Sequence, residues 1–279
     1  KEFKELVYLR SFVDNKSYQQ QGGMVGFETK RGCAESCIYC ADPLAKGREV
    51  RLRNPEAVAQ EMASLVEEGI TCFHTCDSEF NIPYEHALSV CKALNEAGLG
   101  ERIAWYAYLS PLPFDERLAE EMVKAGCKGI NFGTDHSDDL FLKKLGRSYT
   151  RKDIERTAHI AHSFGIEGMF DLLLGGPGET RDTVKDTLSF FSSLPVTAVG
   201  VSWGIRIYPG SRLCEWIRKD PSTFRKGLVG PEERVCSFLE GNDEAALEPI
   251  WYFSPHLGED FQQWLVELTK EEPRFLVSA

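Results

Sequence analysis

The sequence has no long hydrophobic run and no excess of positive charge. No apolar stretch approaches the ~20 residues that a membrane-spanning helix needs. The opening KEFKELVYLR lacks the apolar region of a secretory signal peptide. Acidic residues outnumber basic ones by 43 to 32, and the formal net charge is -11. Because phosphate contacts need clustered Lys and Arg, we expect no nucleic-acid partner and no membrane partner, and a cytoplasmic location.

The sequence also lacks low-complexity segments and a regular cysteine framework. Its 279 residues, 42% of them hydrophobic, suit one large domain with or without a small appendage. The nine cysteines are an odd number and are unevenly spaced apart from one tight cluster. Without a secretory signal, this pattern favours reduced thiols and a metal site over disulfides.

Short apolar runs alternate with amphipathic helices through most of the chain. The runs that predict strands are residues 24–29, 71–75, 103–109, 128–132, 168–174 and 198–207. This alternation predicts a parallel sheet with right-handed crossovers. Six units are fewer than the eight of a closed TIM barrel, so we predict an α/β fold, a partial (β/α)6 TIM-type barrel. A doubly wound sheet is the alternative, and in both folds the active residues follow the carboxyl ends of the strands.

The alternation stops after Pro209, which suggests three segments. We predict an N-terminal lead segment at 1–21, the barrel at 22–210, and a C-terminal appendage at 211–279 that caps the barrel. The appendage is expected to contain a strand at 249–254 and a helix at 259–270.

The segment KRGCAESCIYC carries the tight cysteine cluster. Cys33, Cys37 and Cys40 follow the first strand with the spacing C-x3-C-x2-C. Thiolates are the usual ligands of iron–sulfur clusters. Three of them would leave the fourth iron of a [4Fe–4S] cluster without a protein ligand, and an open metal position is a place for chemistry. The alternative is a zinc site, which would need a fourth Cys or His, and none lies near in the sequence.

This spacing, with an aromatic residue before the last cysteine, resembles the radical S-adenosylmethionine (SAM) superfamily. The resemblance implies a partial barrel and an enzyme that binds SAM at the open iron. An electron from the reduced cluster would cleave SAM to methionine and a 5′-deoxyadenosyl radical, which abstracts hydrogen from a small-molecule substrate. It also implies an electron donor such as flavodoxin or ferredoxin. The sequence does not reveal the substrate or the oligomeric state.

The resemblance further implies which residues near the first two strands contact SAM. Tyr39 would contact the adenine, with plain packing as the alternative. In TCDSEFN, the SAM amino group would be held by Asp77, Ser78 or Glu79, although the usual Gly-Gly-Glu form is absent. A helix N-cap role for Asp77 or Ser78 is the competing explanation.

Later segments supply the remaining implied contacts. In GINFGTDHSDD, the residues Gly133, Asp135 and His136 match the family segment that meets the ribose and the methionine part of SAM. Arg147 resembles a basic residue that binds the SAM carboxylate in several branches. For His136 and Arg147 the alternatives are a capping or a surface role.

The segment FDLLLGGPGET resembles a family motif after the fifth strand. The resemblance implies that Leu174 flanks the adenine and that Gly176 and Glu179 shape the turn. Five aromatic residues are also candidates for a substrate pocket, although barrel aromatics are more often core: Phe80, Tyr106, Tyr108, Trp203 and Trp251.

Several segments look most like the cobalamin-associated branch, which includes C- and P-methylases: QGGMVGFETKRGC, GREVRLRNPE, GINFGTD, LLLGGPGET and WYFSPHLGED. Typical members carry a cobalamin-binding domain before the barrel, but too few residues precede the first strand here to form one. We therefore predict hydrogen abstraction by a radical SAM enzyme with a [4Fe–4S] cluster and SAM as cofactors, and cobalamin as a further candidate. The alternatives are a cobalamin-dependent methyltransferase whose cobalamin domain is missing or trimmed, and a non-catalytic iron–sulfur or zinc-binding module.

Overall fold

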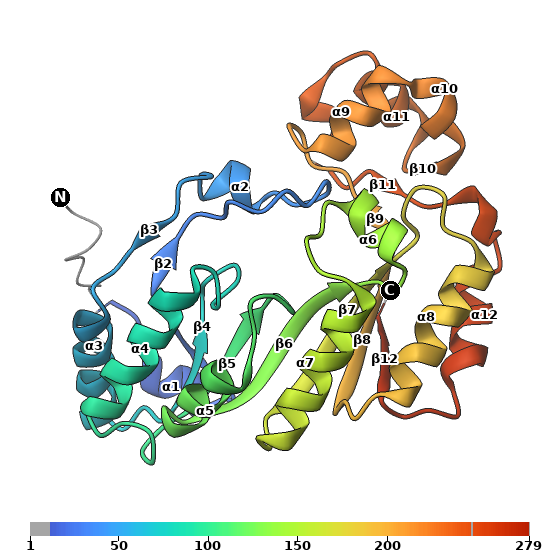
Figure 1. The fold of residues 1–279 in the computed structure, drawn as a ribbon. Coiled ribbons are helices and arrows are strands. Elements are labelled where there is room, and N and C mark those ends of the chain that lie inside the picture. Colours follow the sequence, from blue (N-terminus) through green and yellow to red (C-terminus); the bar gives the residue numbers. More distant parts are fainter. Residues whose placement is uncertain (1–11, 247, 279) are drawn as a thin grey trace. The chain divides into compact units, whose positions relative to one another are not determined.

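The computed structural model describes residues 12–246 and 248–278 (Figure 1). Residues 1–11 of the predicted lead segment at 1–21 lie outside the described residues. The described chain divides into two compact units. The first contains residues 12–34, 46–133 and 155–169, and the second contains 35–45, 134–154 and 170–278 apart from residue 247.

The first unit is built on four parallel strands. Its elements are α1 (Asn15–Gln20), β1 (Val25–Phe27), β2 (Lys30–Arg31), β3 (Arg51–Leu52), α3 (Pro55–Glu67), β4 (Cys72–Thr75), α4 (Tyr84–Glu96), β5 (Ala104–Leu109), α5 (Glu116–Lys124), most of β6 (Cys127–Asp135) and most of α7 (Arg151–Ser163). Strands β1, β4, β5 and β6 pair in parallel in that order. Helices α3, α4 and α5 pack side by side (Figure 1). Asn54 and Asp115 cap α3 and α5 with their side chains, as short polar residues do at helix starts.

The second unit contains the remaining strands and the C-terminal segment. Its elements are α2 (Asp42–Ala45), α6 (Asp139–Leu145), most of β7 (Glu167–Leu174), α8 (Arg181–Ser193), β8 (Ala198–Trp203), β9 (Ile205–Arg206), α9 (Arg212–Lys219), α10 (Pro221–Phe224), β10 (Leu228–Val229), α11 (Glu232–Leu239), β11 (Trp251–Tyr252), α12 (Phe261–Thr269) and β12 (Phe275–Ser278). The main sheet has the order β1-β4-β5-β6-β7-β8-β12, and β6 and β7 each have residues in both units. The predicted class, α/β with a parallel sheet of the partial TIM type, is confirmed.

Two features of this sheet differ from the prediction. The strand expected at 198–207 ends at Trp203, because Gly204 has φ +81° and breaks the extended run. The chain after it forms β9, which joins a small antiparallel sheet of order β10-β11-β9. The main sheet also has a seventh strand, since β12 pairs in parallel with β8 from Phe275 opposite Val199. The segment after residue 210 therefore contributes to the main sheet, and the predicted domain division stays a prediction.

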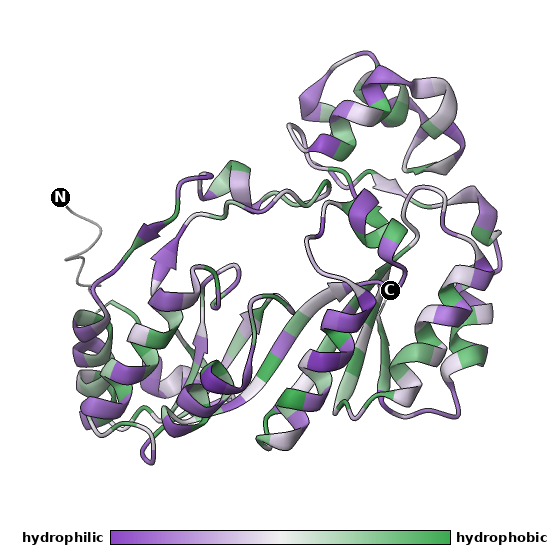
Figure 2. Ribbon diagram, viewed as in Figure 1, coloured by the Kyte–Doolittle hydropathy of each residue, from purple (hydrophilic) through white to green (hydrophobic). Residues whose placement is uncertain are grey.

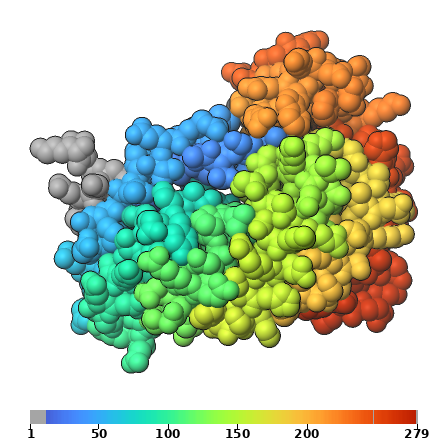
Figure 3. Space-filling model, in the orientation of Figure 1, coloured from blue at the N-terminus to red at the C-terminus, as the bar shows by residue number. Residues whose placement is uncertain are grey.

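A hydrophobic core links the C-terminal segment to the cysteine loop within the second unit. Its fully buried members include Ile38, Leu145 and Phe238. They come from the loop, from α6 and from α11. Helices α9 to α11 form a compact lobe, orange in Figure 3, and carry hydrophobic and hydrophilic residues side by side (Figure 2). None of the helices in the described part of the chain is long and apolar enough to cross a membrane.

Candidate active site

The cysteine loop runs from the first unit into the second between Ala34 and Glu35. At its start, the backbone N–H of Cys33 donates to the carbonyl of Gly47 at 3.0 Å. Gly32 has φ +105°, and a Cβ there would lie 2.1 Å from the carbonyl oxygen of Glu49. Both facts require glycine immediately before the first cysteine.

The later part of the loop is anchored in the second unit by its backbone. Ile38 donates its N–H to the carbonyl of Leu145 at 3.0 Å and accepts at its carbonyl from the N–H of Leu213 at 2.8 Å. Gly146 ends α6 with φ +84°, and a Cβ there would lie 2.2 Å from the carbonyl oxygen of Ser36. The helix end and the loop can approach only because this residue is glycine.

The donor set of the loop fits an iron–sulfur cluster. Cys33, Cys37 and Cys40 are among the nine cysteines that remain thiols. Within residues 12–246 and 248–278, no three His, Cys, Asp or Glu side chains lie close enough to hold a single metal ion. A [4Fe–4S] cluster differs from a single ion because it takes one thiolate at each of several irons. The Sγ of Cys40 also accepts from the N–H of Asp42 at 3.4 Å, and such bonds to sulfur tune cluster potentials.

Asp77 is buried in the first unit and is committed to the chain just before the loop. Its carboxylate accepts from the N–H and the hydroxyl of Thr29, at 2.9 and 2.5 Å, and from the N–H of Lys30 at 3.2 Å. Burial raises the pKa of Asp77 although Lys30 and these hydrogen bonds oppose the shift. Burial likewise lowers the pKa of Lys30. Asp77, in the polar segment after β4, therefore fixes the backbone of Thr29 and Lys30, just before the cysteine loop.

The other two residues of this segment lie beside cations of the same unit. Ser78 accepts from the Nζ of Lys46 at 3.3 Å, and Glu79 acts electrostatically on Lys30. The N-cap explanation for Asp77 or Ser78 is wrong, because α4 begins at Tyr84 with Pro83 in the cap position and no side-chain cap. A contact with the SAM amino group remains a prediction for all three.

Tyr39, Asp135 and Arg147 converge in the second unit. Arg147 donates from Nε to Asp135 Oδ2 at 2.6 Å and from Nη2 to Oδ1 at 3.2 Å. The Tyr39 hydroxyl donates to Asp135 Oδ2 at 2.6 Å and accepts from Arg147 Nη2 at 2.6 Å. Sequence reasoning found all three residues, but not that they bind one another.

The electrostatics of this triad keep its charges paired. Burial raises the pKa of Tyr39 well above its usual value, and Asp135 adds to the shift. Burial lowers the pKa of Arg147, but Asp135 and the nearby Tyr149, Tyr39 and Cys37 together outweigh burial, and the pKa is raised well above its usual value. The side chains of Arg147 and Asp135 are each only 7% exposed, so the alternative of a surface Arg147 is wrong.

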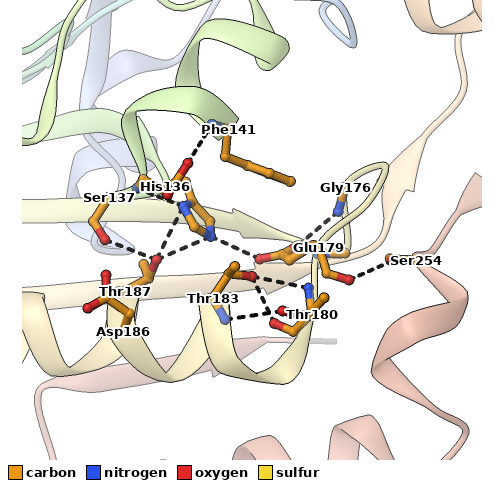
Figure 4. Close-up of polar contacts among 12 residues, drawn as sticks. His136, Ser137, Phe141, Gly176, Glu179, Thr180, Thr183, Asp186, Thr187 and Ser254 are labelled. Carbon is orange, nitrogen blue, oxygen red and sulfur yellow. Dashed lines mark hydrogen bonds and ion pairs between the residues drawn. The ribbon is translucent and has the colours of Figure 1, made fainter.

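His136 and Glu179 form a fully buried pair in the second unit (Figure 4). His136 Nε2 lies 3.2 Å from Glu179 Oε1, and both side chains are 0% exposed. Glu179 Oε2 accepts the N–H groups of Gly175 and Gly176, the latter at 3.0 Å. The surface alternative for His136 is therefore wrong, whereas its ring does accept locally from the N–H of Asp138 at 2.9 Å.

The remaining predicted residues are backbone positions near strand ends. Gly133 lies in β6. Leu174 is fully buried at the end of β7, and its carbonyl accepts from the N–H of Gly204 at 2.8 Å. A Cβ on Gly176 would lie 2.7 Å from the ring of Phe141, so a side chain there would require that ring to shift. Their contacts with SAM stay predictions.

Asp171 on β7 is a candidate that sequence reasoning missed. Burial raises its pKa to about 6, and the nearby charge of Asp135 adds to the shift. No hydrogen bond or ion pair of its carboxyl group occurs among the residues that the structure describes. An acidic residue inside the apolar run FDLLL was the signal that could have found it.

The aromatic candidates have two different environments. In the first unit, Phe80 is core, with its ring edge-on to Trp105 at 5.2 Å. In the second unit, Trp203 and Trp251 line a cavity of about 750 Å³ together with Phe253. Aromatic walls of this kind suit an apolar ligand, within the size range of small-molecule sites.

Comparison with known proteins finds methyltransferases among the similar chains. Tryptophan 2-C-methyltransferase of Streptomyces laurentii is 32% identical over 88% of this chain and 46% of its own length. Cytidylyl-2-hydroxyethylphosphonate methyltransferase of Streptomyces wedmorensis is 26% identical over 81% of this chain and 43% of its own. The chain thus spans less than half the length of these two relatives.

A solved structure is similar along almost the whole chain. It is the radical S-adenosylmethionine methyltransferase TsrM from Kitasatospora setae with cobalamin and a [4Fe–4S] cluster bound. The identity is 31% and the TM-score 0.86, covering 98% of this chain and 58% of that one.

A family model described as the Radical SAM superfamily matches residues 27–191, more than half of the chain. The matched range includes all three cysteines of the loop and ends in α8. It confirms the predicted cofactors, a [4Fe–4S] cluster and SAM, and the prediction of an enzyme over a non-catalytic module. On this match, the chain belongs to the radical SAM superfamily.

Proposed function

We propose that this chain is the radical SAM part of a cobalamin-dependent methyltransferase that methylates a carbon atom of a small molecule. The observation that carries the proposal is the extent of the TsrM similarity. It covers 98% of the chain, whereas the superfamily match ends at residue 191. The region with α9 to α12 and β12, which a generic barrel need not share, is therefore similar as well. The predicted alternative, methyl transfer, is thereby preferred to hydrogen abstraction.

In this proposal the chain's own residues hold the cofactors. Cys33, Cys37 and Cys40 would ligate the cluster, which would be the electron-transfer group of the site when bound. In the first unit, Asp77, Ser78 and Glu79 are the candidates for the SAM amino group. Gly133, on β6, is a candidate for contact with the ribose or the methionine part of SAM. In the second unit, the proposed SAM contacts are Tyr39, Asp135, Arg147, Leu174 and Gly176, whereas the predicted contact at His136 is not carried forward, because its side chain is fully buried. Overall, the S–CH3 bond of SAM would break to leave S-adenosylhomocysteine, and the substrate carbon would gain the methyl group, carried by cobalamin, and lose a proton.

Hydrogen abstraction without cobalamin is the second candidate. The superfamily match of residues 27–191 supports it, because it covers the machinery for SAM cleavage independently of any methyl acceptor. In that reaction an electron from the reduced cluster would cleave SAM to methionine and a 5′-deoxyadenosyl radical, which would take a hydrogen atom from the substrate and become 5′-deoxyadenosine. For either reaction we propose a reductant such as flavodoxin or ferredoxin and a cytoplasmic location.

Anaerobic reconstitution separates the two candidates. The protein is loaded with iron and sulfide and supplied with dithionite, SAM carrying a deuterated methyl group, and L-tryptophan, with and without hydroxocobalamin. The first substrate is chosen because the Streptomyces laurentii relative is named for tryptophan. The proposal expects S-adenosylhomocysteine and a product with three deuterium atoms, both dependent on cobalamin. Formation of 5′-deoxyadenosine without any cobalamin dependence or methylated product would instead favour hydrogen abstraction.

A further inference from the structure

The backbone at the end of β6 is strained at Asp135. Among the residues that the structure describes, Asp135 is the one non-glycine residue with a positive φ, +57°. The N–H of His136 donates to the carbonyl of Thr134 at 2.6 Å, which closes a γ-turn around Asp135. Such conformations persist only where the surroundings hold them, and they are concentrated at functional sites.

The side chain that follows the strained residue is held from several directions (Figure 4). Nδ1 of His136 accepts from the N–H of Asp138 at 2.9 Å. Nε2 faces Glu179 Oε1, and the hydroxyl of Thr187 lies 3.1 Å from Nε2. The ring also lies against Phe141, with centroids 4.5 Å apart. His136 therefore has one orientation.

Glu179 in turn depends on His136. Its Oε2 is occupied by the two glycine N–H groups after β7, and its carbonyl accepts from the hydroxyl of Ser254 at 2.7 Å. Oε1 has no well-aligned hydrogen bond, so the 3.2 Å contact with His136 Nε2 is electrostatic. A fully buried carboxylate that loses such a partner is strongly destabilised. The pair thus joins the end of β6 to the turn after β7.

Asp135 connects the His136–Glu179 pair to the cysteine loop. Its carboxylate, placed by the γ-turn, holds Arg147 and the hydroxyl of Tyr39, and Tyr39 lies between Cys37 and Cys40 in the sequence. We propose that the His136–Glu179 pair is a positioning device for the cysteine loop. It holds the turn at Asp135, which places Tyr39 and so the two neighbouring cluster ligands. This inference rests on the family membership and not on methyl transfer.

Two substitutions of His136 isolate the contact with Glu179. In His136→Asn the amide oxygen can take the place of Nδ1, but no atom reaches Glu179. In His136→Gln the amide N–H can take the place of Nε2 and keep that contact. Thr157→Val is the matched control, because it removes a buried hydroxyl whose bond to the Pro111 carbonyl (3.0 Å) lies wholly within the first unit. Each reconstituted protein is measured for its iron release to a chelator, for the EPR spectrum of the reduced cluster, and for thermal melting.

We expect His136→Asn to release iron roughly tenfold faster than the parent and to change the EPR spectrum, as loss of groups that orient ligands does. His136→Gln should stay close to the parent. Thr157→Val should melt earlier with unchanged iron release. Tyr39→Phe should reproduce the effect of His136→Asn, and the double variant should release iron no faster than Tyr39→Phe alone.

The inference is overturned if His136→Asn behaves as Thr157→Val does, or if the two fold-changes multiply in the double variant. If His136→Asn does not fold, Glu179→Gln and Tyr39→Phe decide the matter, because parental iron release and an unchanged EPR spectrum in both would refute it. None of these measurements uses a methylated product. Their failure would leave the proposed reaction intact, and failure of methyl transfer would leave this inference intact.

Discussion

The two ends of the cysteine loop are held by different kinds of interaction. In the first unit, the chain leading to Cys33 is held by hydrogen bonds to the buried carboxylate of Asp77. In the second unit, the segment from Cys37 to Cys40 is held by the fully buried side chain of Ile38 and by the hydroxyl of Tyr39. The anchor in the first unit is polar. The anchor in the second unit combines the apolar core around Ile38 with the charged pair of Asp135 and Arg147, to which the Tyr39 hydroxyl bonds.

The difference shows what each anchor contributes. Burial of Asp77 opposes its charged form, so the polar anchor adds direction at a cost in stability. Burial of the Ile38 side chain stabilises the folded state, because an apolar group leaves water. Its backbone hydrogen bonds fix the position of the loop. A loop that must place three ligands can thus use rigid geometry at one end and stable packing at the other. Four experiments can break or sharpen this comparison.

The largest effect should come from the cysteines themselves. Replacing any one of Cys33, Cys37 and Cys40 by Ala should abolish the reconstituted cluster and SAM cleavage, because each is proposed to ligate a separate iron. Iron content, the visible absorbance and the formation of SAM-derived products measure this. Cys236→Ala, an exposed thiol of the second unit, should retain the cluster. Retention of a normal cluster by Cys33→Ala alone would mean that the first-unit end of the loop contributes no ligand.

The apolar anchor should matter next. Ile38→Ala should lower the free energy of unfolding by about 2–5 kcal/mol, the range for a fully buried Ile reduced to Ala, and should also accelerate iron release. Ile217→Ala is the matched control, because Ile217 is equally buried in the same core but not in the loop. Urea titration and chelator kinetics give the two quantities. Equal iron release in both variants would show that the packing of Ile38 in this core does not control how firmly the loop holds the cluster.

Glycine positions test the close approaches at the loop. Gly146→Ala should cost about 2 kcal/mol or more, because it adds a clash with the Ser36 carbonyl to the unfavourable φ. Gly241→Ala has φ +100° with nothing within 4 Å, so it should cost only about 1 kcal/mol. In the first unit, Gly32→Ala and Gly69→Ala form the same contrast. The difference in urea midpoint within each pair is the measurement, and a difference of zero would contradict the close approach.

The smallest effect concerns the carboxyl group of Asp171. Its pKa is raised to about 6 in the fold, from 3.8. A raised pKa means that the folded state binds the proton more tightly, so this stability is present below pH 4 and is lost as the pH rises through 6. Asp171→Asn should therefore stabilise the protein by about 1–2 kcal/mol at pH 8, after allowance for solvent screening, and have almost no effect near pH 4. Urea titrations at the two pH values test this, and a destabilised variant at pH 8 would show that the charged form is favoured.

Much of the fold was predictable because its pattern is local. Apolar runs and amphipathic helices located β1 and the strands from β4 to β8, but not the two-residue strands β2 and β3, and the glycine-rich turn after β7 was visible in FDLLLGGPGET. Strand β12 was not found, because four residues near the end of the chain carry no period that separates a sheet strand from a loop. Only its pairing with β8 defines it.

The candidate site divides in the same way. The spacing of Cys33, Cys37 and Cys40, and the residues after each strand, could be identified from the sequence, since ligand type and spacing are properties of a short segment. The sequence could not show that Arg147 is committed to Asp135 and Tyr39, which are 12 and 108 positions away. Nor could it show that the carboxylate of Glu179 faces His136, because that contact depends on where two separate strands end.

The sequence by itself thus determined the three-cysteine segment predicted to hold the cluster, the strand–helix order and the family. The tertiary structure decided how each half of the cysteine loop is held, which polar residues are committed to one another, and that Asp171 carries an uncompensated charge. The physical reason is that backbone propensity and ligand chemistry act over a few residues. Burial and ion pairing, in contrast, depend on distances between segments that only folding brings together.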